Sequence, residues 1–331
     1  MRYDDVIYGP FDIEEPVLLD LMASDALDRL RGVTQHGITA LLGITAPFTR
    51  FDHSVGAMLL VRRLGASLDE QIGALLHDVS HTAFSHVIDF VFDDHSAQSY
   101  HEEKKPGFLA ASDVPGILRR HGRDWRGFVD ETRFSLLEQD LPALCADRLD
   151  YFLRDLEFLE LATSVDIRAT LEALTVHDGR IVVTDADTAR WLAYTFIEVD
   201  RASWSSVREV GVYQVAAEAI KAAVQIGAVS ESDYWGSDEA LWSRLRAAKH
   251  PEVRQWVDRL SPGTRFVADA PSPDFRVSPK VRSIDPPVLS NGAVSPLSEL
   301  DAAFASYRTD CLAAKRGEWS MGVVSAPTAG H

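Results

Sequence analysis

The sequence has very few cysteines, no long apolar run and too little positive charge to balance its acidic side chains. Its two cysteines, Cys145 and Cys311, cannot build the disulfide framework of a small secreted domain, and Cys145 fits a buried thiol. No apolar run approaches the roughly 20 residues of a membrane span, and the first residues lack the basic-then-apolar pattern of a signal peptide. These absences predict a cytoplasmic protein without a membrane partner.

Net charge argues against a polyanionic partner. The chain has 33 Lys and Arg residues against 50 Asp and Glu residues, which gives a net charge of -17. A surface of this sign repels nucleic acid and anionic lipid, so we expect neither as a partner. A Gly-rich phosphate-binding loop and an internal repeat are also missing. Local positive charge or a metal must therefore hold any phosphate-bearing ligand.

The rest of the composition is that of a large globular protein. Hydrophobic residues make up 46% of the 331 residues, enough for one big domain or two smaller ones. Apolar side chains recur at helical spacing, as at Val55, Met58 and Leu59 and again at Tyr194 and Ile197. We therefore predict a mostly α fold.

Histidines are concentrated in one short part of the chain. Four of the 11 histidines, His53, His77, His81 and His86, lie between residues 50 and 89. Two of them fall in a run of apolar and small side chains, where an uncompensated polar ring would be costly to bury. In a helix, His77 and Asp78 project about 100° apart and His81 follows one turn later, so that all three can line one site. A divalent cation is the simplest compensation, because it takes imidazole and carboxylate ligands.

Three separated blocks together resemble a known family. They read Arg50-Phe51-Asp52-His53-Ser54, Leu76-His77-Asp78-Val79-Ser80-His81-Thr82-Ala83-Phe84-Ser85-His86 and Ala146-Asp147-Arg148-Leu149-Asp150-Tyr151-Phe152. In this order they resemble the HD-domain metal-dependent phosphohydrolases, and most of all the deoxynucleoside triphosphate triphosphohydrolase branch. The likeness spans roughly residues 5 to 165. It implies an HD-domain helical bundle that hydrolyses a nucleotide, with a deoxynucleoside triphosphate as the first substrate to test.

The resemblance also implies the catalytic machinery. One divalent ion (Mn, Mg, Fe, Co, Ni or Zn) would lower the pKa of water and withdraw charge from phosphorus. Its ligands would be two histidines and two aspartates: His53, His77, Asp78 and Asp147. The groups that deliver protons beside the leaving group would be two histidines, with a carboxylate orienting the second: His81 and His101, with Asp89 or Glu102.

A third set of residues would bind the nucleotide substrate. By resemblance, Gln35, Tyr151 and Asp155 contact the sugar, while Arg50 and Arg148 contact phosphate oxygens. Two of these have simpler structural interpretations. Gln35 can equally cap a turn, and Arg50 can form a salt bridge with Asp52.

One segment departs from the resembled pattern. Where the triphosphohydrolases carry a His-Lys-type phosphate clamp on a helix, this chain reads Ala202-Ser203-Trp204-Ser205-Ser206-Val207-Arg208. A nucleotide phosphomonoesterase of the 5′-nucleotidase kind is therefore an alternative, as is a catalytically silent nucleotide-binding regulator. Another is a di-iron oxygenase, for which His81 and His101 would supply further ligands. Homo-oligomers are common in the resembled group, so we keep a homo-oligomer open.

The chain divides into three predicted parts. Residues 1–170 form the HD-domain catalytic core, and residues 171–260 form a helical extension with a β-hairpin at Asp178-Gly179. Residues 261–331 form a mixed α/β extension with a Pro-rich linker, short strands, a C-terminal helix over 298–315 and a disordered tail over 325–331. We also predict that the helix carrying Asp147 starts at Asp140, that one helix runs through 188–226, and that strands pair across Asn291-Gly292.

Overall fold

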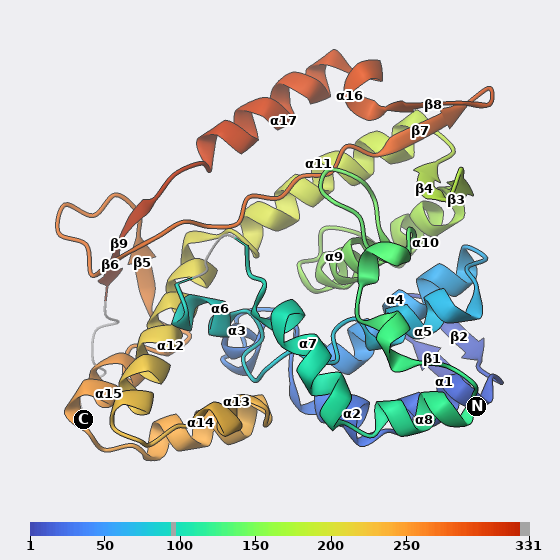
Figure 1. Ribbon diagram of the computed structural model, residues 1–331. Helices are drawn as coiled ribbons and strands as arrows, with labels where there is room; N and C mark the ends of the chain where they lie inside the picture. The colour runs from blue at the N-terminus through green and yellow to red at the C-terminus, as the bar shows by residue number, and fades with distance from the viewer. Residues whose placement is uncertain (94–96, 325–331) are drawn as a thin grey trace.

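The computed structural model describes residues 1–93 and 97–324, and most of the elements in these residues are helices (Figure 1). The predicted mostly α fold is confirmed, while the tail over 325–331 lies outside the described residues. The α-helices are α1 (Pro16–Met22), α2 (Asp25–Asp28), α3 (Ile38–Leu41), α4 (Arg50–Arg63), α5 (Leu68–Leu76), α6 (Val87–Val91), α7 (Tyr100–Ala111), α8 (Val114–Arg120), α9 (Ala146–Phe158), α10 (Ser164–Ala173), α11 (Ala186–Ala202), α12 (Val207–Gln225), α13 (Glu231–Tyr234), α14 (Asp238–Ala247), α15 (Pro251–Val257), α16 (Leu297–Leu300) and α17 (Ala302–Ala314). The 3-10 helices are η1 (Arg29–Gly32), η2 (Trp125–Phe128) and η3 (Glu131–Arg133). The strands are β1 (Arg2–Asp5), β2 (Gly9–Asp12), β3 (Leu174–His177), β4 (Arg180–Val183), β5 (Arg265–Val267), β6 (Phe275–Val277), β7 (Pro287–Ser290), β8 (Ala293–Pro296) and β9 (Trp319–Val324).

Helices α4 and α5 begin at polar caps that the sequence encodes. At α4, the Thr49 hydroxyl accepts the N–H of Asp52, whose carboxylate accepts the N–H of Thr49 in return. At α5, the Ser67 hydroxyl accepts the N–H of Glu70. The Glu70 side chain does not form a capping box with Ser67, because it accepts the N–H of Leu136 at 2.7 Å. It ties α5 to the loop before α9.

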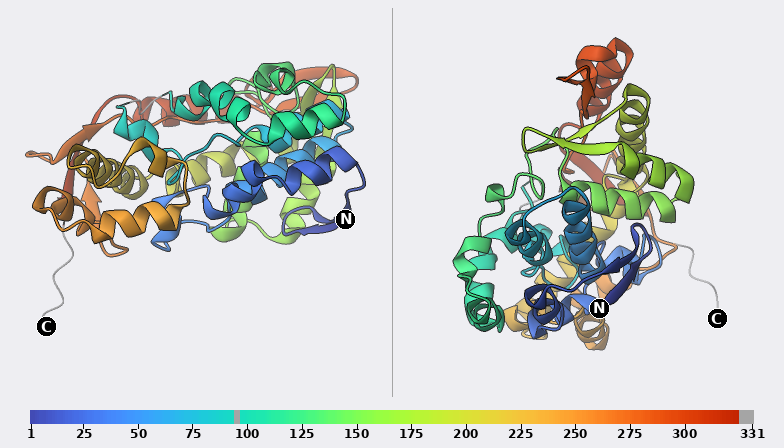
Figure 2. Two further views of the ribbon diagram at one scale, coloured as in Figure 1. Left: turned by 60° about the horizontal axis from the view of Figure 1, so that its bottom comes forward. Right: turned by 90° about the vertical axis from the view of Figure 1, so that its right-hand side faces the viewer.

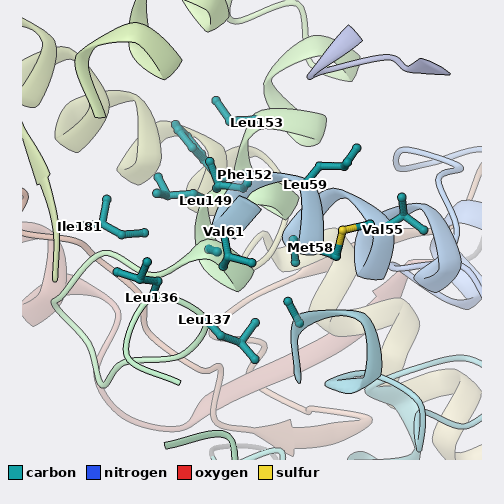
Figure 3. Packing of buried hydrophobic residues seen from close by; sticks show 14 of the residues in the cluster. Val55, Met58, Leu59, Val61, Leu136, Leu137, Leu149, Phe152, Leu153 and Ile181 are labelled. Atoms are coloured by element: carbon teal, nitrogen blue, oxygen red, sulfur yellow. The ribbon is translucent and has the colours of Figure 1, made fainter. Parts of the chain in front are cut away.

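The centre of the core lies between α4 and α9. Figure 3 shows Val61 of α4 close to Leu149 and Phe152 of α9, with Met58 and Val55 further along α4 in the same cluster. All five side chains are buried, and burying a side chain of this kind contributes about 1.5–3 kcal/mol. This packing fixes the spacing of two helices that carry predicted site residues.

Two predicted helix boundaries are wrong. The helix carrying Asp147 begins at Ala146 rather than at Asp140, because the N–H groups of Ala146 and Asp147 bind the carbonyl oxygens of Leu136 and Leu137. The predicted helix over 188–226 is broken between α11 and α12. Two serine side chains form local hydrogen bonds at this break. The Ser205 hydroxyl donates to the Asp200 carboxylate, and the Ser206 hydroxyl accepts the N–H of Glu209 and so caps α12.

Small sheets join distant parts of the chain. The predicted hairpin β3–β4 extends through β7 and β8 into a sheet of order β3-β4-β7-β8, and β7 and β8 pair across Asn291-Gly292 as predicted. Another sheet, β5-β9-β6, was not predicted. Its central strand β9 ends at Val324, directly before the predicted tail. Helix α17 lies along the outer side of α11, as both views in Figure 2 and Figure 1 show.

An irregular segment, residues 278–286, connects the two sheets. It leaves β6, runs past the helical core and enters β7 (Figure 1). The buried hydrophobic residues of the described chain form two clusters, and each contains residues from all three predicted parts. The predicted division at residues 170 and 260 therefore stays a prediction. Among the described residues, no helix is long and apolar enough to cross a bilayer.

Candidate metal centre and cavity

Three helices bring the four predicted metal ligands together. His53 lies in the first turns of α4, His77 and Asp78 lie where α5 ends, and Asp147 lies in the first turn of α9. Nε2 of His53 is 2.9 Å from Oδ1 of Asp147 and 3.1 Å from Nε2 of His77. Oδ2 of Asp78 lies 3.6 Å from Nε2 of His53. Residues separated by up to 94 positions thus form one cluster.

The hydrogen bonds around this cluster direct Nε2 of both histidines toward its centre. Nδ1 of His77 donates to the carbonyl oxygen of Ala74 at 2.7 Å, and Nδ1 of His53 donates to the carboxylate of Asp150 at 2.7 Å. When both rings are neutral, each presents a lone pair at Nε2, and the two lone pairs face each other beside the Asp147 carboxylate. Arg50 donates to Asp78 at the edge of the cluster, but Nε2 of both rings and Oδ1 of Asp147 converge as acceptors, so these three groups fit a cation.

The pKa of His77 reflects the same demand for positive charge. Burial alone would lower this pKa, but the carboxylates of Asp78 and Asp147 raise it to about 10. Burial would raise the pKa of Asp147, and the two histidines instead hold it well below its usual range. A proton and a divalent cation would compete for the same place.

Asp150 also belongs to this cluster, although no role was predicted for it. Besides holding His53, its Oδ2 accepts Nε of Arg154 at 2.9 Å, and Arg154 also binds Asp5 at 2.8 Å. Gly56 of α4 allows this network, because a Cβ there would meet Oδ1 of Asp150 at 2.0 Å. The spacing Asp147-x-x-Asp150 on one helix was the available signal.

A second cluster of histidines lies next to Asp78. The ring of His81 stacks on His101 at 3.9 Å between centroids, and His86 meets both rings edge-on. Nε2 of His81 is 3.2 Å from Oδ1 of Asp78. Asp78, His81 and His101 present ligand atoms within 4.8 Å of one another, so this group is also able to hold a cation. Nδ1 of His101 is buried without a hydrogen bond to any described residue.

Burial keeps this histidine cluster neutral. Burial and the charge of Arg50 lower the pKa of His81 to about 3. Burial also holds the pKa of His101 well below its ordinary value, and the neighbouring His81 adds to this. The rings are therefore uncharged near neutral pH when the site carries only protein groups.

The two carboxylates predicted to orient His101 differ in position. Asp89 accepts the N–H of Tyr100 and lies 3.0 Å from Nδ1 of His86, so it reaches His101 through the neighbouring ring. Glu102 lies 4.0 Å from Nε2 of His101, and its side chain is 68% exposed. Burial raises the pKa of Glu102.

A cavity of about 200 Å³ opens beside both clusters. Most of the predicted site residues line it: Gln35, Arg50, His77, Asp78, His81, His101, Glu102, Asp147, Arg148 and Tyr151. His53, Asp89 and Asp155 do not. His53 and Asp89 contact cavity-lining side chains from behind.

The two predicted phosphate-binding arginines are held by protein groups. Arg50 binds Asp78 at 2.7 Å and Ser85 at 3.1 Å, so the alternative salt bridge with Asp52 is wrong. Asp52 instead completes the cap of α4. Arg148 donates to the Ala143 carbonyl oxygen at 2.7 Å and lies 3.4 Å from Glu138.

One of the predicted sugar-binding residues, Asp155, contacts a buried histidine to which no role was predicted. Nε2 of His36 is 2.8 Å from Asp155, and its Nδ1 is 3.3 Å from Glu209. Asp155 also accepts the indole N–H of Trp204 at 2.6 Å. Tyr151 packs on Trp204, and the buried Oε1 of Gln35 has no hydrogen bond to any described residue. Burial would lower the pKa of His36, but Asp155 and Glu209 raise it to about 10.

Several cavity-lining residues come from parts of the chain to which no role was assigned. They are Glu131, Glu138, Glu209, Tyr213, Lys280 and Arg282. Glu131 and Glu138 lie in or near η3, Glu209 and Tyr213 lie on α12, and the two cations lie in the 278–286 segment. No spacing pattern in the sequence links these positions, because tertiary packing alone brings them together.

Comparison with known proteins places this geometry in context. A sequence model of the HD domain family matches residues 50–155. The chain is 40% identical over 300 residues to the metal-dependent phosphohydrolase cns2 of Cordyceps militaris, covering 88% of this chain and 86% of that protein. It is 21% identical over 302 residues to the deoxynucleoside triphosphate triphosphohydrolase SAMHD1 homolog of Dictyostelium discoideum, covering 76% of this chain and 56% of that protein. A crystal structure of a phosphohydrolase from Bacteroides thetaiotaomicron shares the fold, with a TM-score of 0.70, 17% identity, and coverage of 98% of this chain and 100% of that chain.

Proposed function

The chain belongs to the HD-domain metal-dependent phosphohydrolases, and we propose that it hydrolyses a phosphate ester of a nucleotide. The observation that carries this proposal is the convergence of acceptors from His53, His77 and Asp147 beside a cavity with basic side chains. With Asp78, these residues would hold the divalent metal. When bound, such a cation lowers the pKa of water toward about 7 and withdraws charge from phosphorus.

The chain's own residues would orient the reacting groups and move the proton. Asp150 fixes the His53 ring through its Nδ1–H, and Arg50 fixes the Asp78 carboxylate. His81 and His101 are neutral and both line the cavity beside Asp78, so either ring is suited to exchange a proton with the leaving oxygen. Asp89 and Glu102 would support them.

For the nucleotide itself, a deoxynucleoside triphosphate is the first substrate in our proposal. The likeness to a deoxynucleoside triphosphate triphosphohydrolase of Dictyostelium discoideum supports it. Gln35 offers an unpaired buried oxygen and Tyr151 an aromatic face, which suit a sugar and a base, while Asp155 would act through His36. Cleavage at the α-phosphate would release a deoxynucleoside together with tripolyphosphate.

The size of the cavity favours a second candidate, a nucleotide phosphomonoesterase. A cavity of about 200 Å³ is small beside the usual range for ligand pockets, and a monophosphate needs less room than a triphosphate.

A product assay separates these candidates. The purified chain is loaded with each of several divalent metals, its metal content is measured, and a panel of ribo- and deoxynucleotides is tested. Tripolyphosphate with nucleoside identifies a triphosphohydrolase, and orthophosphate from monophosphates identifies the phosphomonoesterase. Asp147→Ala should abolish either activity.

Two outcomes would contradict hydrolysis. Nucleotide binding without turnover in every metal would identify a regulator. Iron content above one per chain together with oxygen consumption would identify an oxygenase built on Asp78, His81 and His101.

A further inference from the structure

Lys280 and Arg282 bring two positive charges to the cavity from the far end of the chain. They lie outside residues 50–155, where the family match is found. On the basis of the proposed function, we propose that these two side chains form the cavity's anion subsite and bind phosphate oxygens that the metal centre does not reach. The subsite would take the place of the clamp that residues 202–208 lack.

Lys280 and Arg282 donate to neutral oxygens, and the carboxylates of Glu102, Asp89 and Asp147 offset the positive charge of Lys280 only in part. Lys280 donates to the carbonyl oxygen of Ala97 at 3.0 Å, and Arg282 donates to the side-chain oxygen of Gln98 at 2.9 Å. Across residues 1–93 and 97–324, no salt bridge joins either side chain to a carboxylate. Arg50 and Arg148, in contrast, are paired with Asp78 and Glu138. The charges available to an anion are therefore those of Lys280 and Arg282.

Lys280 and Arg282 are both half-buried, and the repulsion between their charges is unfavourable when no anion is bound. Burial lowers the pKa of Lys280 to about 8, and the charge of Arg282 contributes to this shift. Burial and then the charges of Arg50, Lys280 and Arg282 hold the pKa of His86 well below its ordinary value. The field of the two cations thus extends to the histidine cluster, and an anion between them would relieve the repulsion.

The segment that carries the two cations is anchored on both sides. Strand β6 pairs with β9 before it, and β7 pairs with β4 after it. Within it, the N–H of Asp285 binds the Pro142 carbonyl oxygen at 2.9 Å, Arg308 donates to Ser283 at 2.9 Å, and Ile284 is fully buried. Lys280 and Arg282 both line the cavity from this anchored segment. Fixed cations lose little freedom on binding an anion.

Anion titration tests the subsite without requiring turnover. The full chain, loaded with a divalent metal, is titrated with inorganic phosphate and separately with tripolyphosphate by calorimetry. We expect the dissociation constant to rise about tenfold for each cation removed and about a hundredfold in the double variant Lys280→Met/Arg282→Met. The anion whose dissociation constant rises more in the variants shows whether the cations bind a single phosphate or a polyphosphate chain.

Two variants serve as controls. Lys249→Met removes the same charge at an exposed position between α14 and α15 and should leave binding within twofold of wild type. Lys280→Arg keeps the charge and should retain most of the affinity. Equal anion affinity in the wild type and the double variant would overturn the proposal, as would a wild type that binds neither anion. Because binding is measured directly, absence of nucleotide hydrolysis would overturn the proposed function alone.

Thermal unfolding distinguishes the anion subsite from a merely structural role. Without anion, the double variant should unfold at the same or a higher temperature, because like-charge repulsion is removed; tripolyphosphate should stabilise the wild type and not the variant. A destabilised double variant that keeps its anion affinity would show that the cations only hold residues 97 and 98. If the double variant does not fold, Lys280→Met is measured by the same criteria.

Discussion

At the scale of single residues, Asp150 fixes the tautomer and the orientation of the His53 ring. Its carboxylate accepts Nδ1–H of His53, which leaves the lone pair at Nε2 directed toward His77 and Asp147. Carboxylate partners of this kind fix the tautomer and raise the basicity of a ligating imidazole. Asp150 is fully buried, so it contributes through the ring and without contact to substrate.

We expect Asp150→Asn to weaken metal binding by about 10- to 100-fold. The neutral amide oxygen is a weaker acceptor for Nδ1–H of His53 than a carboxylate is, and the amide N–H can instead donate to Nδ1, which would leave the proton on Nε2, the atom that binds the metal. Metal titration against a chelating dye measures the dissociation constant. Asp310→Asn, at an exposed position on α17, is the matched control and should bind metal like the wild type. Unchanged affinity in Asp150→Asn would show that His53 does not need its partner.

A pH-dependent contribution to stability comes from His36. Its pKa is about 10 in the folded protein, against about 6.5 in the unfolded chain. Below pH 6.5 both states are protonated and the contribution is complete. Between pH 6.5 and 10 the unfolded chain loses this proton while the folded protein keeps it, so the contribution falls as pH rises.

Urea unfolding at pH 6, 8 and 9.5 checks this. Relative to His36→Gln, the wild type should lose on the order of a few kcal/mol of unfolding free energy over this range. His250→Gln, which changes an exposed histidine, should preserve the wild-type slope. If the unfolding free energy fell equally with pH in the wild type and in His36→Gln, the raised pKa of His36 would be contradicted.

At the scale of elements, α4 and α9 approach closely at Gly56. A side chain at this position would overlap the Asp150 carboxylate and the Arg154 guanidinium, since a Cβ would lie 2.2 Å from the latter. Both partners are buried and bound to each other, so neither can move aside without breaking the network around His53. The absence of a side chain here is what lets the two helices share one site.

Gly56→Ala should therefore lower the unfolding free energy by about 1–3 kcal/mol, the usual cost of overpacking, and weaken metal binding as well. Gly107→Ala on α7 is the control. A Cβ at Gly107 meets no atom within 4 Å, so alanine should stabilise that helix by about 0.5–1 kcal/mol. Denaturant unfolding of both variants measures the difference, and equal effects would contradict the close approach.

The elements also show what a sequence can and cannot predict. Helical periodicity and local turn chemistry identified α4, α5, the β3–β4 hairpin and the turn at Asn291-Gly292, because their causes lie within a few residues. The four metal-ligand candidates came from the resemblance of three separated sequence blocks to a known family, because local spacing does not relate Asp147 to His53. Lys280 was not found, since its place in the cavity depends on strand pairings of β6 and β7 with distant strands. The break between α11 and α12 was missed because serine side chains there compete for hydrogen bonds that periodicity does not register.

At the scale of the whole molecule, the metal site links three helices that are far apart in sequence. A ligand that binds only the folded protein stabilises it, by about 2.7 kcal/mol when its concentration is 100 times its dissociation constant. Chelating the metal from the loaded protein should therefore lower the unfolding temperature by about 4 °C for a chain of this size. Differential scanning calorimetry measures this shift, and Asp147→Ala, in which the site cannot close, should show no response to the chelator.

The 278–286 segment has a consequence for how the protein matures during translation. Domains form progressively from the N-terminus as the ribosome elongates the chain. The acceptors of α4, α5 and α9 emerge early, whereas β6, which precedes Lys280, completes its pairing only when β9 has been synthesised. A nascent chain would thus become competent to capture a cation well before it can retain a phosphate, and hydrolysis would begin only near the end of synthesis.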